Sequence, residues 1–139
     1  MRIVLDACAA IAYLRGEAGS DIVKDYLLDE TNTCLMHVIY LCEVYYDFLK
    51  AADEKTAQEA IRDIESIDVV SRDDLDRAFW LGVGQLKANH KLSLADCFAV
   101  ILAQRMQATL LTSDHREFDP LAAKSVCQMA FLRLSLIHI

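Results

Sequence analysis

The sequence predicts an α/β domain with a mostly parallel central sheet of four or five strands. Short apolar segments alternate along the chain with longer segments of helical periodicity. The short segments are apolar throughout rather than at every second residue, which is typical of strands buried on both faces. The chain has 139 residues, of which 55% are hydrophobic. This length supports one core, so we expect a single domain over residues 1–139.

The expected elements can be placed in chain order. Strands are expected at residues 2–5, 33–38, 67–70 and 109–112, and within 126–132. Helices are expected at residues 7–14, 21–29, 39–51, 53–65 and 94–107, and a further one starts at Asp73 or Asp74. Gly16 and Gly19 interrupt the helical pattern, so that Ser20 can cap the second helix. Residues 117–121, with the only proline, read as a turn.

The helix at 94–107 and the strand that follows it bring two carboxylates close together. Ser93 is a good N-cap, and Asp96 lies in the first helical turn. About fourteen helical residues at ~1.5 Å each cover roughly 21 Å. The strand runs back roughly 16 Å at ~3.3 Å per residue. If the two pack antiparallel, Asp96 and Asp114 become neighbours at one edge of the sheet.

Two further acids are candidates for the same edge. Asp6 ends the first strand, where ligands of parallel sheets gather, but it could equally be only the N-cap of the next helix. Glu43 lies about one turn into its helix and could reach back to the edge. It could also be a solvated side chain, since it flanks the apolar face formed by Val38, Leu41, Cys42, Tyr45, Phe48 and Leu49. Asp96 could be only a capping residue, and Asp114 only a turn residue.

Four carboxylates in one pocket would need a compensating charge. Two carboxylates ~4 Å apart repel by about 4 kcal/mol at an effective dielectric of 20. A cation or bound protons would relieve this repulsion. Oxygen ligands without paired His or Cys select a hard ion such as Mg²⁺ or Mn²⁺. Such a site can hydrolyse phosphodiesters without a histidine base.

Composition and charge limit the kinds of partner, the cellular compartment and the state of the cysteines that we expect. The formal net charge of −7 argues against a general nucleic-acid binder, although local basic residues could still contact a phosphate chain. We expect a cytoplasmic protein, because the sequence shows neither a membrane span nor a signal peptide. The cysteines lack CxxC spacing and are expected to be buried thiols: Cys8, Cys34, Cys42, Cys97 and Cys127.

Four segments resemble the motif blocks of PIN-domain ribonucleases, specifically the toxins of VapBC toxin-antitoxin modules. They are IVLDACAAIAYL at 3–14, LCEVYYDF at 41–48, KLSLADCFAVILA at 91–103 and TLLTSDHREFDPL at 109–121. They occur in the family's order and span nearly the whole chain. The resemblance implies a three-layer α/β/α PIN-like domain that commonly forms a homodimer. It further implies RNA cleavage with Mg²⁺ or Mn²⁺, and silencing by a VapB-type antitoxin.

The resemblance also assigns roles to individual residues. It makes Asp6, Glu43, Asp96 and Asp114 the acids of the metal site, with Asp6 and Asp96 as direct ligands. Ser113 corresponds to a hydroxyl residue that supports a water or ligand. Glu117 or Asp119 is an open candidate for a further acid, because three residues separate Asp114 from Phe118.

Basic and aromatic residues are weaker candidates. Arg116, two residues after Asp114, is the best candidate for a phosphate contact; the others are Arg15, Lys24, His115 and Lys124. Scattered solubilising charge is the alternative for each. Phe79 and Trp80 could stack on bases, but core packing is the simpler interpretation at helical spacing. Tyr45, Tyr46 and Phe48 could belong to the core or to a dimer or antitoxin surface.

Two rival functions follow from the same residues. Phosphatase chemistry of the haloacid-dehalogenase kind needs a second aspartate two residues after Asp6, where this chain has Cys8. A non-catalytic PIN-like module that binds RNA or protein would be expected to lack metal-site acids, and all four are present. The sequence therefore favours a metal-dependent endoribonuclease. It does not name the RNA that is cleaved.

Overall fold

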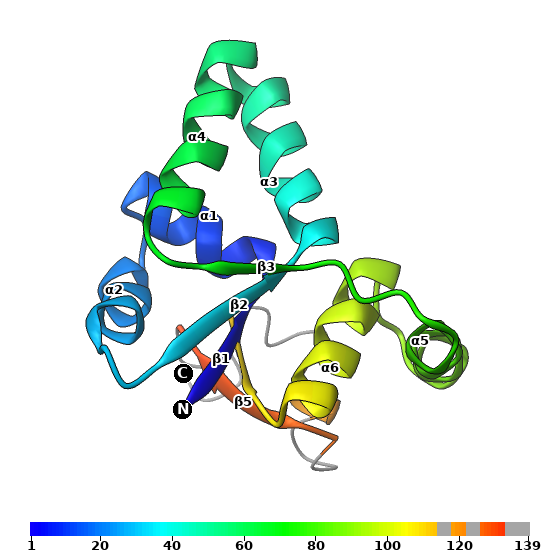
Figure 1. Cartoon of the computed structure of the whole chain (residues 1–139). Helices are drawn as coiled ribbons and strands as arrows, with labels where there is room; N and C mark the ends of the chain where they lie inside the picture. The colour runs from blue at the N-terminus through cyan, green and yellow to red at the C-terminus, as the bar shows by residue number, and fades with distance from the viewer. Residues whose placement is uncertain (114–117, 122–125, 133–139) are drawn as a thin grey trace.

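A computed structural model describes residues 1–113, 118–121 and 126–132 as one sheet covered by helices (Figure 1). The sheet has five strands, all parallel, in the order β3-β2-β1-β4-β5. The strands are β1 (Arg2–Leu5), β2 (Thr33–His37), β3 (Val70–Arg72), β4 (Thr109–Thr112) and β5 (Gln128–Phe131). The helices are α1 (Ala7–Arg15), α2 (Ser20–Leu28), α3 (Val38–Ala51), α4 (Glu54–Ser66), α5 (Arg77–Asn89) and α6 (Leu94–Met106). The predicted α/β class and parallel sheet are confirmed.

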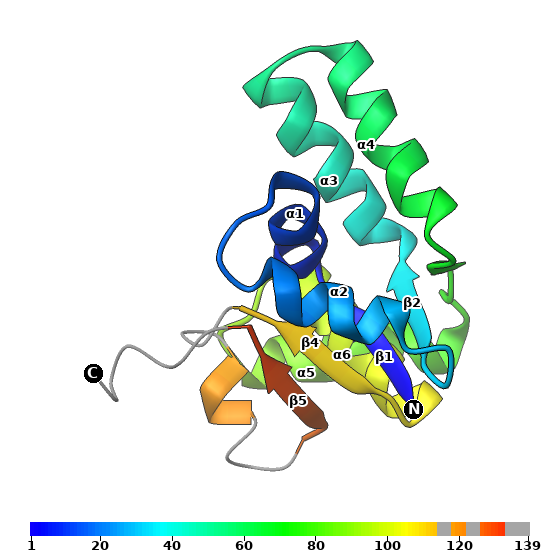
Figure 2. The same ribbon diagram turned by 90° about the vertical axis from the view of Figure 1, so that its left-hand side faces the viewer.

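Helices cover both faces of the sheet, as the turned view in Figure 2 also shows. Ile3 and Leu5 of β1 pack in a cluster with Val23 of α2. Val4, which points the opposite way, packs in a second cluster with Leu102 of α6. Successive residues of one strand thus enter different cores, which explains why the strand is apolar throughout. The three-layer α/β/α arrangement is confirmed.

Helices α3 and α4 form a hairpin that projects beyond the sheet (Figures 1 and 2). The fully buried residues of α3 are Tyr40 and Val44. The apolar face expected from the helical wheel is wrong in part, because Val38 is 44% exposed and Cys42 is also exposed. The reason is that α3 packs mainly along α4, and contacts α1 and α6 as well, instead of lying flat on the sheet.

The third strand and the helix after it begin later than the sequence suggested. β3 is Val70–Arg72 rather than 67–70, and α5 begins at Arg77 rather than at Asp73 or Asp74. Asp76 is the N-cap of α5. Asp74 instead accepts two hydrogen bonds from Arg72, so it belongs to an ion pair and not to the helix.

Other local expectations also differ from the structure. The N-cap of α2 is Gly19 rather than Ser20, and Gly19 has a φ of 92°, a value that suits glycine. Residues 118–121 are helical rather than a turn. Cys34 and Cys97 are buried as expected, but Cys8 and Cys42 are exposed. None of the cysteines forms a disulfide.

In the part of the chain that the structure describes, every helix is too short or too polar to cross a membrane.

Candidate active site

The strand order places a topological switch point between β1 and β4. From β1 the chain proceeds outward through β2 to β3, and β4 and β5 then lie on the other side of β1. Ligands of open parallel sheets bind at such switch points, beyond the carboxyl ends of the strands. Asp6 follows β1 and Ser113 follows β4, so both flank this switch point. The backbone N–H of Asp6 donates to the carbonyl of Leu111 at 3.4 Å.

Asp6 is the N-cap of α1. Its Oδ1 accepts a hydrogen bond from the backbone N–H of Ala9 at 2.8 Å, and the residue is buried. The capping role that the sequence left open is therefore confirmed. Asp6 follows β1 and so also lies at the switch point. The same residue can therefore cap α1 and bind a ligand there. The ligand role itself stays a prediction.

Asp96 lies in the first turn of α6 and contacts α3. Its backbone N–H donates to Oγ of Ser93 at 3.1 Å, which confirms Ser93 as the N-cap. The hydroxyl of Tyr40 donates to Oδ1 of Asp96 at 2.5 Å. Since Tyr40 lies in the first turn of α3, just after β2, this hydrogen bond brings the start of α6 to the carboxyl edge of the sheet.

The charges of three predicted site acids act on the Tyr40 hydroxyl. Burial raises the pKa of Tyr40 well above its usual value, and the negative charges of Asp96, Asp6 and Glu43 raise it further. The pKa of Glu43 is also raised, first by burial and then by the charge of Asp96. The structure thus brings Asp6, Glu43 and Asp96 into one electrostatic environment around a single hydroxyl.

The fourth predicted acid is Asp114, and its position relative to the other three is not described. Asp114 lies outside the described residues, as do Arg116 and Glu117. Ser113 is described and lines a pocket next to the edge. Asp119 is half-buried in the helical segment 118–121. The roles of these residues therefore remain predictions.

The metal site predicted from the sequence stays a prediction. Among the residues that the structure describes, no group of three or more His, Cys, Asp or Glu side chains is arranged to hold a metal ion. However, the raised pKa of Glu43 shows that the site disfavours further negative charge, and a cation would reverse that. The donors are all carboxylate oxygens, which Mg²⁺ and Mn²⁺ prefer.

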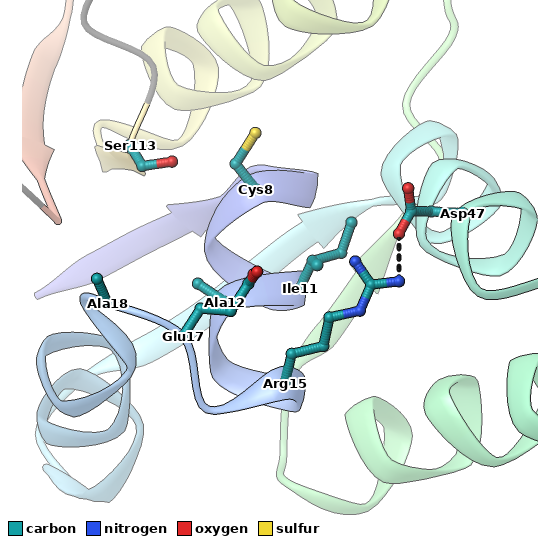
Figure 3. A pocket seen from close by; sticks show the side chains of 8 residues that line it. All are labelled: Cys8, Ile11, Ala12, Arg15, Glu17, Ala18, Asp47 and Ser113. Atoms are coloured by element: carbon teal, nitrogen blue, oxygen red, sulfur yellow. Dashed lines mark ion pairs between the residues drawn. The ribbon is translucent and has the colours of Figure 1, made fainter. Parts of the chain in front are cut away.

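A pocket of about 220 Å³ opens beside the edge (Figure 3). Cys8 and Ser113 line one end of it, and Arg15 and Asp47 line the other. A guanidinium nitrogen of Arg15 is 2.8 Å from Oδ2 of Asp47, although the two groups are not aligned for a hydrogen bond. The same guanidinium lies 4.5 Å from the ring centroid of Phe48. Arg15, a candidate phosphate contact, is therefore already paired with an acid.

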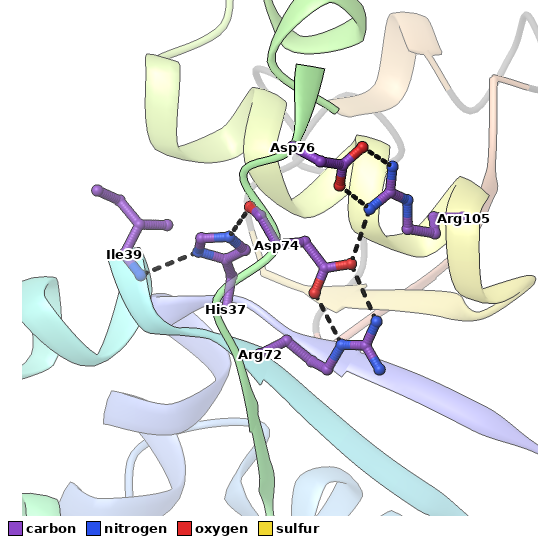
Figure 4. A network of polar contacts seen from close by, with 6 residues as sticks. All are labelled: His37, Ile39, Arg72, Asp74, Asp76 and Arg105. Atoms are coloured by element: carbon purple, nitrogen blue, oxygen red, sulfur yellow. Dashed lines mark hydrogen bonds and ion pairs between the residues drawn. The ribbon is translucent and has the colours of Figure 1, made fainter. Parts of the chain in front are cut away.

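Two residues that matter to the edge were not identified from the sequence. Tyr40 was not considered, although it lies three residues before Glu43 and so on the same helical face. His37 was given no role, yet it is buried and caps α3. Its Nδ1 accepts from the N–H of Ile39 at 3.1 Å, which leaves Nε2 to donate to the carbonyl of Asp74 at 2.9 Å (Figure 4). The sequence signal for this capping role is a histidine directly before an apolar helix.

A group of ion pairs joins β3, α6 and the segment before α5. The carboxylate of Asp74 accepts from Arg72 and from Arg105, and Arg105 also pairs with Asp76 (Figure 4). Hydrogen bonds from Arg72 and Arg105 lower the pKa of Asp74 to about 2. These contacts join β3 and the segment before α5 to α6. They are structural contacts away from the three acids.

Of the two aromatic residues considered for base stacking, one is in the core. Phe79 is completely buried, and its ring centroid is 5.6 Å from that of His37. Trp80 is 45% exposed, and the guanidinium of Arg77 lies 5.4 Å from its ring centroid. The core interpretation is confirmed for Phe79 and wrong for Trp80. On α3, Tyr46 is exposed, and Tyr45 and Phe48 are half-buried.

The fold and the edge together define a small α/β/α domain with buried and half-buried acids at the switch point of a parallel sheet. The chain belongs to the PIN domain family, which it matches over residues 3–124. This confirms the family that the four sequence segments resemble. None of the curated proteins compared with the chain matches it.

Solved structures of toxin-antitoxin complexes share this fold. VapBC from Salmonella typhimurium, bound to DNA, has a TM-score of 0.73 at 16% identity, over 96% of this chain and 99% of that chain. VapBC2 from Rickettsia felis, bound to a promoter DNA fragment, has a TM-score of 0.72 at 17% identity, over 94% and 98%. VapBC-1 from nontypeable Haemophilus influenzae has a TM-score of 0.70 at 18% identity, over 95% and 98%. At these identities the similarity establishes the fold.

Proposed function

We propose that the protein is a Mg²⁺-dependent endoribonuclease, the toxin of a VapBC-type pair that inhibits translation and growth. The observation that carries this proposal is that Tyr40 donates to Asp96 while the charges of Asp6 and Glu43 also act on the same hydroxyl, beside the switch point of the sheet. Membership of the PIN domain family supports the nuclease class. The oxygen-only donor set supports Mg²⁺, with Mn²⁺ as a substitute.

Each acid has a proposed task. Asp6 and Asp96 bind the cation, because each lies at the start of a helix and takes part in a capping hydrogen bond: Oδ1 of Asp6 accepts from the N–H of Ala9, and the N–H of Asp96 donates to Oγ of Ser93. Glu43 and Asp114 complete the site or orient a water. When bound, the divalent ion supplies Lewis-acid activation of the phosphodiester and lowers the pKa of a water. Ser113 and Arg116 are proposed to contact a water and a phosphate, respectively.

The proposed partners follow from the structural neighbours. Those neighbours are described as VapBC toxin-antitoxin complexes, two of them bound to DNA. We infer that this chain binds a VapB-type antitoxin, acts in the cytoplasm and forms a homodimer. If a short reading frame lies next to this gene, co-expression with its product tests the first inference, because a true antitoxin would co-purify and block cleavage. Sedimentation analysis tests the homodimer.

The deciding experiment is RNA cleavage by the purified protein. Activity is expected with Mg²⁺ or Mn²⁺ and should disappear with EDTA. Asp6→Asn and Asp96→Asn each remove one carboxylate charge and keep the side-chain shape, so both should lose cleavage while remaining folded. Equal cleavage under all of these conditions would sink the proposal, because it would point to a contaminating nuclease or a metal-free mechanism.

A non-catalytic PIN-like module is the second candidate. It is favoured by one observation, namely that no three metal-binding side chains are arranged as a site among the described residues. Calorimetric titration of MnCl₂ into the free protein separates the two candidates. Heat of binding that Asp96→Asn abolishes supports the enzyme, and no heat with either protein supports the binding module.

A further inference from the structure

Tyr40 differs from every other tyrosine of the chain in its burial. Of the five tyrosines, it alone is fully buried, with 1% of its surface exposed. Burying a phenol is costly unless its hydroxyl has a hydrogen-bond partner. The partner is Oδ1 of Asp96, 2.5 Å away, on a helix 56 residues further along the chain. This hydrogen bond therefore fixes α3 to α6 at the candidate site.

The hydroxyl is the donor in this pair. An ionised carboxylate only accepts hydrogen bonds, so the proton belongs to Tyr40. A hydrogen bond from a neutral hydroxyl to a carboxylate is short and strong, and it restricts the rotation of the carboxylate. Asp96 is thus held at both its backbone N–H and its side chain.

We propose that Tyr40 is a positioning residue for metal binding: its hydroxyl holds Oδ1 of Asp96 so that this carboxylate faces the cation at the sheet edge. The inference rests on the proposed function. Groups that orient a metal ligand typically contribute about 10- to 100-fold to metal affinity. Tyr40 acts through Asp96 and need not touch the ion or the RNA.

The position of Tyr40 on α3 supports this role. Tyr40 and Glu43 are three residues apart, so one helical face presents a donor for Asp96 and a further acid to the same edge. The cap at His37 fixes the first turn of this helix. α3 therefore positions two site acids: it carries Glu43, and through the Tyr40 hydroxyl it holds Asp96.

A purely structural role makes a different prediction. If the hydrogen bond only stabilises the contact between α3 and α6, Tyr40→Phe lowers stability but leaves the metal affinity of the folded protein unchanged. If Tyr40 positions Asp96, the same change weakens metal binding even where the protein is fully folded. Metal affinity measured below the unfolding transition separates the two roles.

The experiment titrates MnCl₂ into the full-length protein by calorimetry. Tyr40→Phe is expected to weaken Mn²⁺ binding by about 10- to 100-fold. Tyr45→Phe, which removes a half-buried hydroxyl from the same helix, is the matched control and should bind as the wild type does. In cleavage assays, Tyr40→Phe should need more Mn²⁺ for half-maximal rate and recover most activity at saturating Mn²⁺.

A rescue variant tests the donor itself. 4-Aminophenylalanine at position 40 keeps the ring and an N–H donor, so it should restore Mn²⁺ affinity. If Tyr40→Phe does not fold, 4-fluorophenylalanine, which keeps the ring but cannot donate, takes its place. Wild-type Mn²⁺ affinity in a folded variant without the donor overturns this inference and leaves the nuclease proposal standing. Absence of Mn²⁺ binding by the wild type overturns both.

Discussion

The guanidinium of Arg105 pairs with both carboxylate oxygens of Asp76. Arg105 lies near the end of α6, and Asp76 is the N-cap of α5. Arg105 also donates to Asp74 at 3.0 Å, and its guanidinium lies 5.2 Å from the ring centroid of Phe79. A single side chain therefore joins α6, the segment before α5 and the aromatic core.

Replacing Arg105 should loosen that junction. Arg105→Gln removes the paired charge and leaves Asp74, whose side chain is only 8% exposed, with Arg72 as its remaining ion-pair partner among the described residues. We expect the melting temperature to fall by several degrees. Arg62→Gln, at an exposed position of α4, removes the same charge and should have little effect. Equal melting temperatures for the two variants would contradict a structural role for the junction.

The same ion pairs predict loss of stability in acid. Hydrogen bonds from Arg72 to Asp74, and from Arg105 to Asp76, hold the pKa of each carboxyl at about 2 instead of 3.8. A depressed pKa contributes stability above the unfolded value, and this contribution is lost as the pH falls from about 4 to about 2. Urea unfolding at pH 5 and pH 3 measures it. The double variant Asp74→Asn, Asp76→Asn should show a smaller difference between the two pH values.

Glu43 should have the opposite effect on stability. Its pKa is raised above 4.5 by burial and by Asp96, so the folded protein loses stability as the pH rises through this range and Glu43 ionises. With EDTA at pH 7, Glu43→Gln should therefore raise the melting temperature by a few degrees. With Mn²⁺ the wild type should gain more stability than the variant does. A lower melting temperature for Glu43→Gln in EDTA would show that the ionised carboxylate is not under strain.

His37 should contribute through its cap and its hydrogen bond to Asp74. His37→Ala removes the acceptor for Ile39 and the donor to the Asp74 carbonyl. We expect a loss of about 2–4 kcal/mol of unfolding free energy in urea titrations. His37→Asn keeps a capping side chain and should lose less. If both variants lose the same free energy, the cap contributes nothing measurable.

Gly19 should tolerate a side chain poorly. A Cβ there would lie 2.6 Å from Cβ of Leu132, and the residue has a φ of 92°. Gly19→Ala is expected to lose about 2–5 kcal/mol, from overpacking and from the left-handed backbone. Gly16 has a φ of 63° but open space around it, so Gly16→Ala should lose only the backbone part, about 1–2 kcal/mol. Unfolding free energies of the two variants separate the contributions.

The sequence predicts β1, β2 and β4 better than β3 and the start of α5. Apolar strands such as Thr109–Thr112 are found at their predicted residues because burial on both faces leaves a continuous hydrophobic signal. The start of α5 was misplaced because Asp73, Asp74 and Asp76 are all plausible caps. An ion pair formed in the folded protein decides among them.

The candidate site was predictable where chain topology alone brings residues together. Asp6 and Asp96 follow from strand ends and helix starts. The placement of Glu43 came mainly from family resemblance, because the buried face of α3 depends on its packing against α4. Tyr40 could not be assigned a partner from sequence, because its hydrogen bond joins residues 56 positions apart.

The cap formed by Asp6 bears on how RNA could be captured from cells. Asparagine caps helices about as well as aspartate does, so Asp6→Asn keeps the hydrogen bond to Ala9 and loses only the charge. Asp6→Ala would also release the first turn of α1, and lost binding could then be mistaken for lost folding. If the proposed ribonuclease activity holds, the asparagine variant is therefore the better bait for cross-linking and sequencing the RNA substrate.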